Sequence, residues 1–218
     1  SDFLDLATVM KASQAISDEM VLEQLLEKMM RIVIENAGAE RGVLILAKQE
    51  QFWLEAEAQV EEECKVTLRS IPLEQASQEL LVSTAVINTV VRNKTPLVLN
   101  DATQEESLAN DRYLIEKQPK SVLGQPILYH GQLTGVLYLE NNLMSNAFTS
   151  DRLTVLKLLA TQIAISLENA QTMAHLDAKV AERTAQLNAK VEELTQTRHE
   201  LVQSEKMASL GRLVAGFA

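Results

Sequence analysis

The chain has 218 residues, enough for one full domain with an appendage or for two small domains. Its formal net charge is −10 and its basic residues are scattered, which argues against nucleic acid and anionic membrane surfaces as partners. No apolar run approaches the roughly 20 residues of a membrane span, and the single cysteine, Cys64, excludes an intrachain disulfide and argues against a structural zinc site. We therefore expect a cytoplasmic protein without membrane insertion.

Two helices are expected at the start of the chain. Residues 2–16 have a broad apolar face that includes Phe3 and Met10. After a polar break at Ser17, the apolar residues of a second helix lie at the spacing of a one-sided stripe: Leu22, Leu25, Leu26, Met29 and Val33. This helix should end at Gly38, because a left-handed cap costs glycine little.

Strand patterns follow. Residues 43–47 form a short continuous apolar run, typical of a strand buried on both faces, and residues 52–60 and 60–68 alternate with period two. Ser83 should cap a further helix, and residues 96–99 should form a short strand. The pattern predicts an antiparallel sheet with flanking helices.

Residues 100–120 are polar and irregular, with a helical turn expected around Tyr113. Strands at 122–129 and 133–140 flank His130 and Gly131, where glycine suits a tight hairpin turn. Pro126 lacks an amide donor, so its strand should lie at an edge or carry a bulge there. The predicted fold class is α+β.

The last third of the chain is different. It contains no proline after residue 150 and no glycine until Gly211, and Phe148 and Leu153 fit a hydrophobic staple around an N-cap at Thr149. One apolar row has steps of three and four: Leu153, Leu156, Ala160, Ile163, Leu167 and Ala170. The next row has an unbroken step of seven: Met173, Val180, Leu187, Leu194, Leu201 and Ala208.

A sustained step of seven predicts a coiled coil. A helix over 150–210 would be about 90 Å long, so it needs a partner helix, and we expect a dimer interface at Val180, Leu187, Leu194 and Leu201. The other core row is mostly polar: Ala170, Asp177, Thr184, Val191, Arg198 and Glu205. Such a seam is either a passive stalk or a signalling helix with two packings close in energy. The pattern changes phase between Ala170 and Met173.

Several motifs carry a family resemblance. The hairpin from Gly124 leads into Leu139-Glu140-Asn141-Asn142, then Phe148-Thr149, then a helix that ends at Ala170. This stretch resembles a GAF domain, a small-molecule sensor and dimerisation module, over about residues 18–170. The tail from Ser204 through Gly211 resembles the approach to a histidine-kinase dimerisation and phosphoacceptor domain. The arrangement is similar to multidomain sensor kinases, including hybrid Ser/Thr and histidine kinases of the cyanobacterial type.

The resemblance implies four segments. Residues 1–17 would be an N-terminal linker helix, 18–170 the GAF domain, 171–206 a coiled-coil signalling helix, and 207–218 the start of a histidine-kinase dimerisation domain, cut before its phosphoacceptor. His199-Glu200-Leu201 superficially resembles a phosphoacceptor box. The matching lead-in lies after His199, however, which favours a solvated coiled-coil histidine.

The family's cofactors are not expected. Bilin-binding relatives attach the chromophore to a cysteine near segment 100–124, which has none, and Cys64 lies in strand alternation. The cyclic-nucleotide signature Asn-Lys, Phe, Asp-Glu is replaced by Asn141-Asn142, Phe148 and Asp151-Arg152. For haem, His130 lies in a turn, and His175 and His199 lie on outer coiled-coil positions. No bilin, haem or metal is expected, which leaves room for an unidentified small ligand.

The candidate ligand pocket lies beneath segment 100–121, where a long polar segment should stay at the surface and form a lid. Its candidate residues supply donors and acceptors: Asn100, Asp101, Asp111, Arg112 and Tyr113. The alternative is that Asn100 and Asp101 cap a turn and Arg112 pairs with a neighbouring carboxylate.

The sequence thus predicts the input module of a two-component sensor histidine kinase, a parallel homodimer that feeds a downstream kinase core. No phosphate loop, nucleophile elbow or paired metal-spaced histidines are present, so we expect no catalysis by this chain itself. The alternative is a constitutive dimerisation scaffold that binds no ligand. A cavity of several hundred Å³ with converging polar groups would favour the sensor.

Overall fold

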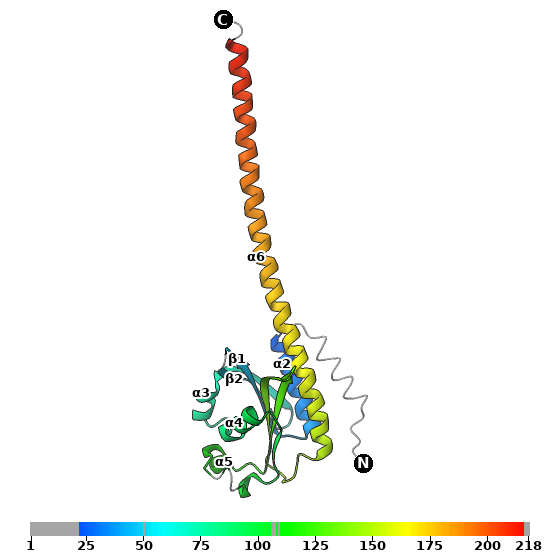
Figure 1. The fold of residues 1–218 in the computed structure, drawn as a ribbon. Helices are drawn as coiled ribbons and strands as arrows, with labels where there is room; N and C mark the ends of the chain where they lie inside the picture. Colours follow the sequence, from blue (N-terminus) through cyan, green and yellow to red (C-terminus); the bar gives the residue numbers. More distant parts are fainter. Residues whose placement is uncertain (1–21, 50, 106–107, 109, 216–218) are drawn as a thin grey trace. The chain divides into compact units, whose positions relative to one another are not determined.

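The computed structural model describes residues 22–49, 51–105, 108 and 110–215. The helix expected at residues 2–16 lies outside the described residues. Contacts divide the chain into two units, Ser1–Ala170 and Gln171–Ala218. The first holds a sheet with helices on both faces, and the second is the C-terminal part of one long helix (Figure 1).

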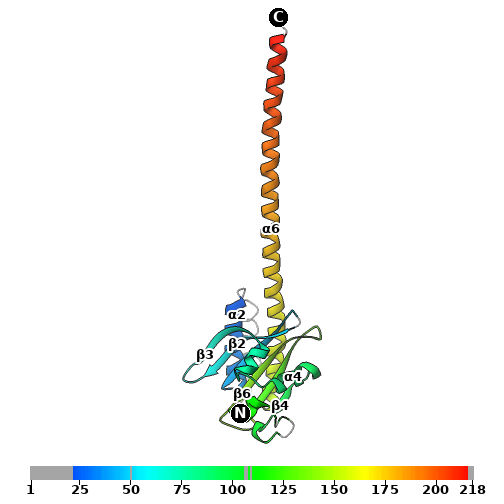
Figure 2. The same cartoon turned by 90° about the vertical axis from the view of Figure 1, so that its left-hand side faces the viewer.

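The described residues of the first unit contain a six-stranded antiparallel sheet, in the order β3-β2-β1-β6-β5-β4 (Figure 2). The strands are β1 (Arg41–Lys48), β2 (Gln51–Val60), β3 (Cys64–Pro72), β4 (Leu97–Leu99), β5 (Ser121–Tyr129) and β6 (Gln132–Asn141). The predicted α+β class with an antiparallel sheet is confirmed. Each strand predicted from its apolar pattern is present, but the third, predicted at residues 60–68, begins later, at Cys64, and extends to Pro72, because residues 61–63 form the turn after β2.

Two layers of helices cover the sheet (Figure 1). On one face lie α2 (Leu22–Ala37) and the first turns of α6 (Ser150–Ala215). On the other lie α3 (Leu73–Gln78), α4 (Thr84–Asn93) and α5 (Arg112–Lys117), with the 3₁₀ turn η1 (Ala102–Gln104). Helix α3 was not predicted from the sequence, because it is too short to show a helical period.

The central strand β1 is buried on both faces, as its continuous apolar run predicts. Leu44 and Leu46 pack in the core beneath α2 and α6, whereas Val43 and Ile45 pack in the core beneath α3, α4 and α5. The sheet therefore separates two apolar cores, and polar groups at the strand ends lie at the boundary between sheet and helices.

The predicted caps and turns are confirmed. Ser83 Oγ accepts from the Val86 amide at 3.2 Å at the start of α4. Gly38 has a φ of +62°, and His130 and Gly131 have φ of +47° and +77° in the hairpin between β5 and β6. Pro126 lies beyond Gly124, the last residue of β5 that pairs with β4, so β5 is an edge strand at this point, and a register irregularity follows between Ile127 and Leu128.

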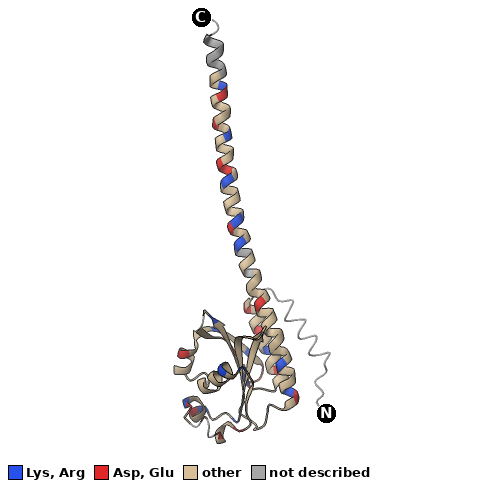
Figure 3. Cartoon of the chain, in the orientation of Figure 1, with Lys and Arg blue, Asp and Glu red and all other residues tan. Residues whose placement is uncertain are grey.

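Helix α6 is 66 residues long, as the pattern without proline predicts. Its first turn begins after Thr149, whose Oγ1 accepts from the Arg152 amide at 3.5 Å, and Phe148 packs with Leu153 in the apolar core. Along residues 171–208 of the second unit the described side chains are exposed, and acidic and basic residues are interspersed along the helix (Figure 3).

Candidate functional site

A hollow of about 300 Å³ opens where β1, β2 and β6 meet α5 and the segment before α4. Its lining is mostly polar and comes from five parts of the chain: Arg41, Glu57, Gln59, Leu80, Leu81, Tyr113, Lys117, Glu140 and Asn142. Carboxylates, cations, amides and a phenol thus converge on one small space. Such converging donors and acceptors can orient a small polar molecule.

Arg41 is the centre of the cluster. Its Nε donates to Glu57 Oε1 at 2.9 Å, and its Nη1 donates to Tyr113 Oη at 3.0 Å and to Glu140 Oε2 at 3.2 Å. Its Nη2 donates to the carbonyl oxygen of Leu81 at 2.6 Å. The guanidinium of one β1 residue therefore joins β2, β6, α5 and the segment between α3 and α4, while only 13% of its side chain is exposed.

Glu140 is the most deeply buried charge of the cluster, with 2% of its side chain exposed. Tyr138 donates to its Oε1 at 2.7 Å, and Tyr113 donates to its Oε2 at 2.9 Å, beside the bond from Arg41. The two tyrosine rings meet edge to face at 6.3 Å. A buried carboxylate is tolerated only when it is paired and hydrogen-bonded, and Glu140 meets both conditions.

The electrostatics hold this arrangement in one protonation state. Burial raises the pKa of Tyr113 and Tyr138 above their usual range, and the charge of Glu140 raises both further. Burial acts to lower the pKa of Arg41, but the surrounding Glu140, Tyr113 and Glu57 raise it above its usual range. Both phenols therefore stay protonated as donors, and the guanidinium stays charged.

Arg69 is a second arginine that contacts a carboxylate of this cluster. Arg69 Nε lies 3.2 Å from Glu57 Oε2, an ion pair without the geometry of a hydrogen bond. The two carboxylates of the cluster, Glu57 and Glu140, are thus matched by Arg41 and Arg69.

Of the five residues proposed from the sequence, Tyr113 is the one that the structure places in this cluster. Asp101 accepts from the Thr103 amide and caps η1, and Asp111 accepts from the Leu114 amide and caps α5. The Asn100 carbonyl accepts from the Asn146 amide, and Arg112 pairs with Glu116 at 2.8 Å. The contacts of Asp101 and Arg112 are those of the alternative interpretation, whereas Asn100 contributes its backbone carbonyl rather than a side-chain cap.

Three residues of the cluster were not predicted from the sequence as site residues: Arg41, Glu57 and Glu140. They lie in three strands far apart in the sequence, and their approach depends on the strand order. The available signal was the position of Glu140 at the end of the apolar strand β6, where a carboxylate that becomes buried requires a partner.

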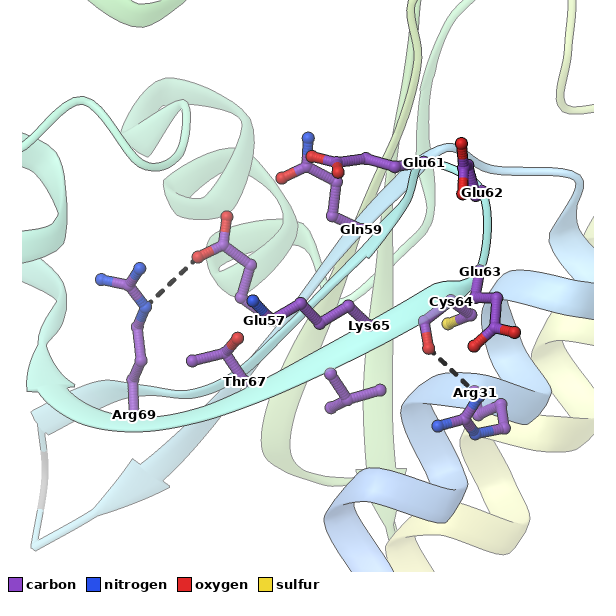
Figure 4. A pocket seen from close by; sticks show the side chains of 11 residues that line it. Arg31, Glu57, Gln59, Glu61, Glu62, Glu63, Cys64, Lys65, Thr67 and Arg69 are labelled. Carbon is purple, nitrogen blue, oxygen red and sulfur yellow. Dashed lines mark hydrogen bonds and ion pairs between the residues drawn. The ribbon is translucent and has the colours of Figure 1, made fainter.

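A larger and shallower hollow of about 820 Å³ lies over β2 and β3 beside α2 (Figure 4). Glu61, Glu62 and Glu63 line one end, and Lys65, Thr67 and Arg69 project from β3 (Figure 4). Arg31 of α2 donates to the carbonyl oxygen of Cys64 at 3.1 Å. Its lining side chains are largely exposed and carry both signs of charge, which selects no ligand class.

Cys64 lies at the edge of this hollow. Burial raises the pKa of its thiol, Arg31 acts to lower it, and Glu35 raises it, with a net rise. The thiol therefore remains protonated near neutral pH, unlike a reactive cysteine.

The described residues contain neither a cluster of metal-binding side chains nor a membrane-spanning helix. No group of three or more His, Cys, Asp and Glu residues there could hold a metal ion. Within the same part of the chain, no helix combines the length and apolar character needed to cross a membrane.

The chain is similar to proteins of one known domain family. The family model described as "GAF domain" matches residues 21–167. Hybrid signal transduction histidine kinase G of Dictyostelium discoideum is 42% identical over 87 residues, 40% of this chain and 2% of that protein. Peroxide stress-activated histidine kinase mak3 of Schizosaccharomyces pombe is 28% identical over 169 residues, 77% of this chain and 7% of that protein. The chain thus spans a small part of these kinases.

Among solved structures, the GAF domain of an Acinetobacter phosphoenolpyruvate-protein phosphotransferase superposes with a TM-score of 0.59 at 19% identity. The match covers 79% of this chain and 97% of that one. At this identity the likeness shows the fold alone.

Proposed function

The chain belongs to the GAF domain family, and from this premise we propose that it is the sensory input and dimerisation module of a two-component sensor histidine kinase. Two copies join in a parallel coiled coil over residues 171–206, which passes a signal from the GAF domain to the kinase core. The intact protein binds ATP and phosphorylates a histidine, whereas this chain alone does neither. The relatedness to histidine kinases supports this reading.

The exposed apolar row on α6 carries the proposal. Its members are between 61% and 68% exposed: Val180, Leu187, Leu194 and Leu201. A row of large apolar side chains at a step of seven loses its contact with water when a second helix packs along it. A parallel pairing is proposed because a kinase core downstream needs both chains to leave at the same end.

The second core row gives this coiled coil a marginal stability. Val191 is its apolar member in the middle of the helix, whereas Thr184, Arg198 and Glu205 are polar. Polar residues at such positions fix register at a cost in stability. A passive stalk and a helix with two packings of similar energy both remain consistent with this pattern.

The test of the proposal is the oligomeric state. Light scattering of the 218-residue chain at micromolar concentration should give the mass of a dimer. Leu194→Asp should shift the mass towards the monomer, because an unpaired charge in an apolar seam is strongly unfavourable. A monomeric wild-type chain would contradict the proposal.

The absence of activity is tested separately. Incubation of the chain with labelled ATP should leave no phosphoryl label on it. Label on His199 would show that this residue, which we interpret as a solvated coiled-coil histidine, is a phosphoacceptor.

We place the ligand site in the hollow beside Arg41. Segment 100–121, proposed from the sequence, contributes Tyr113 and Lys117 to its lining. A thermal-shift screen of small polar metabolites tests this, with Lys117→Ala and Arg112→Ala as paired variants, since both side chains are exposed on α5. Stabilisation lost only in Lys117→Ala supports the hollow, whereas stabilisation lost only in Arg112→Ala places the site on the outer surface of α5.

The alternative function is a constitutive dimerisation scaffold. One observation favours it: each nitrogen of Arg41 already has a partner within the chain, so a ligand would have to displace an existing bond. Native mass spectrometry of the purified protein separates the two functions. A co-purified small molecule supports the sensor, and its absence together with a silent thermal-shift screen supports the scaffold.

A further inference from the structure

One wall of the hollow beside Arg41 is formed by the connection between α3 and α4, residues 79–83. Leu80 and Leu81 of this connection line the hollow. The carbonyl oxygen of Leu81 accepts from Arg41 Nη2 at 2.6 Å. A ligand that binds this nitrogen therefore competes with a backbone carbonyl of the connection.

The backbone of the connection is strained at Leu80, which has a φ of +53°. The Leu80 amide donates to the Ser77 carbonyl at 3.1 Å. The Leu81 amide donates to the Ala76 carbonyl at 2.9 Å. These bonds end a helix around a left-handed residue, a position where glycine is usual because a Cβ is disfavoured there. Among the described residues other than glycine with positive φ, Leu80 is the one with an apolar side chain.

The helix before the connection gives it little support. Helix α3 has six residues, its first turn has no side-chain cap at Pro72, and its buried residue is Ala76. Helix α4 on the other side starts at the cap of Ser83 and buries Val86 and Ile87. Segments with few buried apolar contacts open at a lower free energy than the core does. We therefore expect the connection to move on the side of α3.

The other partners of Arg41 are held more firmly than the Leu81 carbonyl. Glu57 and Glu140 are opposite charges, and Glu140 would keep no ionic partner in its buried position if Arg41 left it. The hydroxyl of Tyr113 is a neutral acceptor, but its own bond to Glu140 at 2.9 Å fixes it. The Leu81 carbonyl is a neutral acceptor in a strained segment, so it is the partner that a ligand can replace.

The charges around the hollow favour an anion. Glu57 and Glu140 are matched by Arg41 and Arg69. Lys117 also lines the hollow, and within the described residues its ammonium has no hydrogen bond or ion pair. The hollow therefore has one cation in excess. An anionic oxygen in place of the backbone carbonyl would also give the guanidinium a partner of opposite charge.

We propose that the ligand of this hollow is a small anion, a carboxylate or a phosphate, whose oxygen replaces the Leu81 carbonyl at Arg41 Nη2 while the connection opens. This inference rests on the proposed ligand site beside Arg41. Opening lets Leu80 leave the left-handed region, so relief of strain offsets part of the cost of the broken bond. Water can hydrogen-bond the released carbonyl, because the connection lies at the surface. The fully bonded Arg41 is then the ligand-free state of the site.

Hydrogen exchange of the full chain, measured by mass spectrometry with fragmentation, tests the opening. The probes are succinate and inorganic phosphate, with neutral succinamide as the control at constant ionic strength. An anion that binds should raise the thermal unfolding temperature and, at saturation, speed exchange of the Leu80 and Leu81 amides at least fivefold. The Lys94 amide is the internal control, since Lys94 ends α4 with a left-handed cap and does not line the hollow. Its exchange should not become faster.

Two variants of α5 separate binding in the hollow from a general salt effect. Lys117→Gln should weaken the response to the anion at least threefold, because it removes the cation in excess. Arg112→Gln should leave that response unchanged, since Arg112 is exposed on the same helix and does not line the hollow. An equal response in both variants would overturn the proposed role of the hollow in binding the anion.

The outcomes separate this inference from the proposed function. Stabilisation by an anion without faster exchange at Leu80 and Leu81 would overturn the opening of the connection and leave the ligand site standing. Stabilisation by succinamide equal to that by succinate, or no stabilisation by either anion, would overturn the anionic class. A co-purified neutral molecule in the native mass spectrum would then still support the sensor. If no molecule co-purifies and the thermal-shift screen is silent, the sensor function fails together with the inference.

Discussion

Asn141 Nδ2 donates a 2.9 Å hydrogen bond to the carbonyl oxygen of Gly38, joining the end of β6 to the residue that follows α2. The same side chain accepts, through Oδ1, from the amides of Leu143 and Met144 at 3.0 and 2.9 Å. A single buried amide thus orients the loop between β6 and α6. Glu140 next to it belongs to the Arg41 cluster, so the cluster and the approach to α6 share one strand end.

Asn141→Ala should lower the free energy of unfolding by about 1–3 kcal/mol, because it removes three part-buried hydrogen bonds, to the Gly38 carbonyl and from the amides of Leu143 and Met144. Asn142→Ala is the matched control, since Asn142 is exposed and its own bond to Glu40 uses the backbone amide. Urea unfolding followed by circular dichroism measures both. Equal losses in the two variants would show that the Asn141 side chain does not hold the loop.

Gly38→Ala should destabilise the fold more than Gly131→Ala. Both glycines have positive φ, a conformation that costs an alanine about 1–2 kcal/mol. At Gly38 a new Cβ would also lie 2.7 Å from the guanidinium carbon of Arg152, whereas at Gly131 it meets nothing within 4 Å. Thermal unfolding of the two variants isolates the contact with Arg152, and a difference near zero would mean that Arg152 moves aside freely.

Glu140→Ala should lower the free energy of unfolding by about 2–6 kcal/mol, because it leaves the buried hydroxyls of Tyr113 and Tyr138 without their acceptor, at about 1–3 kcal/mol each, while Arg41 keeps Glu57 as its ionic partner. Arg112→Ala breaks an exposed pair within α5 and should change the unfolding free energy by less than about 0.5 kcal/mol. Guanidinium unfolding compares them. A small effect of Glu140→Ala would mean that water reaches the two hydroxyls and replaces the carboxylate.

Stability should fall in alkaline solution because of Tyr113 and Tyr138. Their folded pKa values are raised by burial and by Glu140, above an unfolded value of about 10. The unfolded chain therefore loses these protons first, so their contribution is full below about pH 10 and declines as pH rises above it. Urea unfolding measured at pH 8 and at pH 11 tests this. The decrease in the free energy of unfolding between the two pH values should be smaller for Tyr113→Phe than for the wild type.

Cys64 should react slowly with iodoacetamide and with hydrogen peroxide near pH 7. Its thiol pKa is raised, chiefly by burial, and the thiolate is the reactive form. Mass spectrometry should show that Cys64 is modified more slowly in the folded chain than in the same chain unfolded in urea. The Cys64→Ser variant measures any modification at other residues. Faster modification in the folded state would identify Cys64 as an activated thiol.

Most of the fold could be predicted because its signals are local. The continuous apolar run of β1, the period of two in β2 and the positive φ at Gly131 each depend on a few neighbouring residues. The same holds for the N-cap at Ser83 and for the length of α6. The exception is α3, which is shorter than two helical turns and is held by its contacts with β2 and β3.

The site could not be predicted in the same way. Arg41, Glu57 and Glu140 approach one another only because β6 pairs with β1 and β1 pairs with β2, and no local pattern records that order. Segment 100–121 was proposed for its polarity, but polar side chains also cap helices and pair on surfaces, as Asp101, Asp111 and Arg112 do.

The sequence by itself determined the secondary structure, the α+β class and the two apolar rows of α6, since periodicity and turn chemistry act over a few residues. Tertiary structure alone decided which row is buried in the chain's own core and which is exposed, because the same helical spacing fits either neighbour. It also decided that a buried carboxylate, an arginine and two tyrosines form one cluster. Such a cluster depends on distances across the sheet, and these are set by strand order rather than by position along the chain.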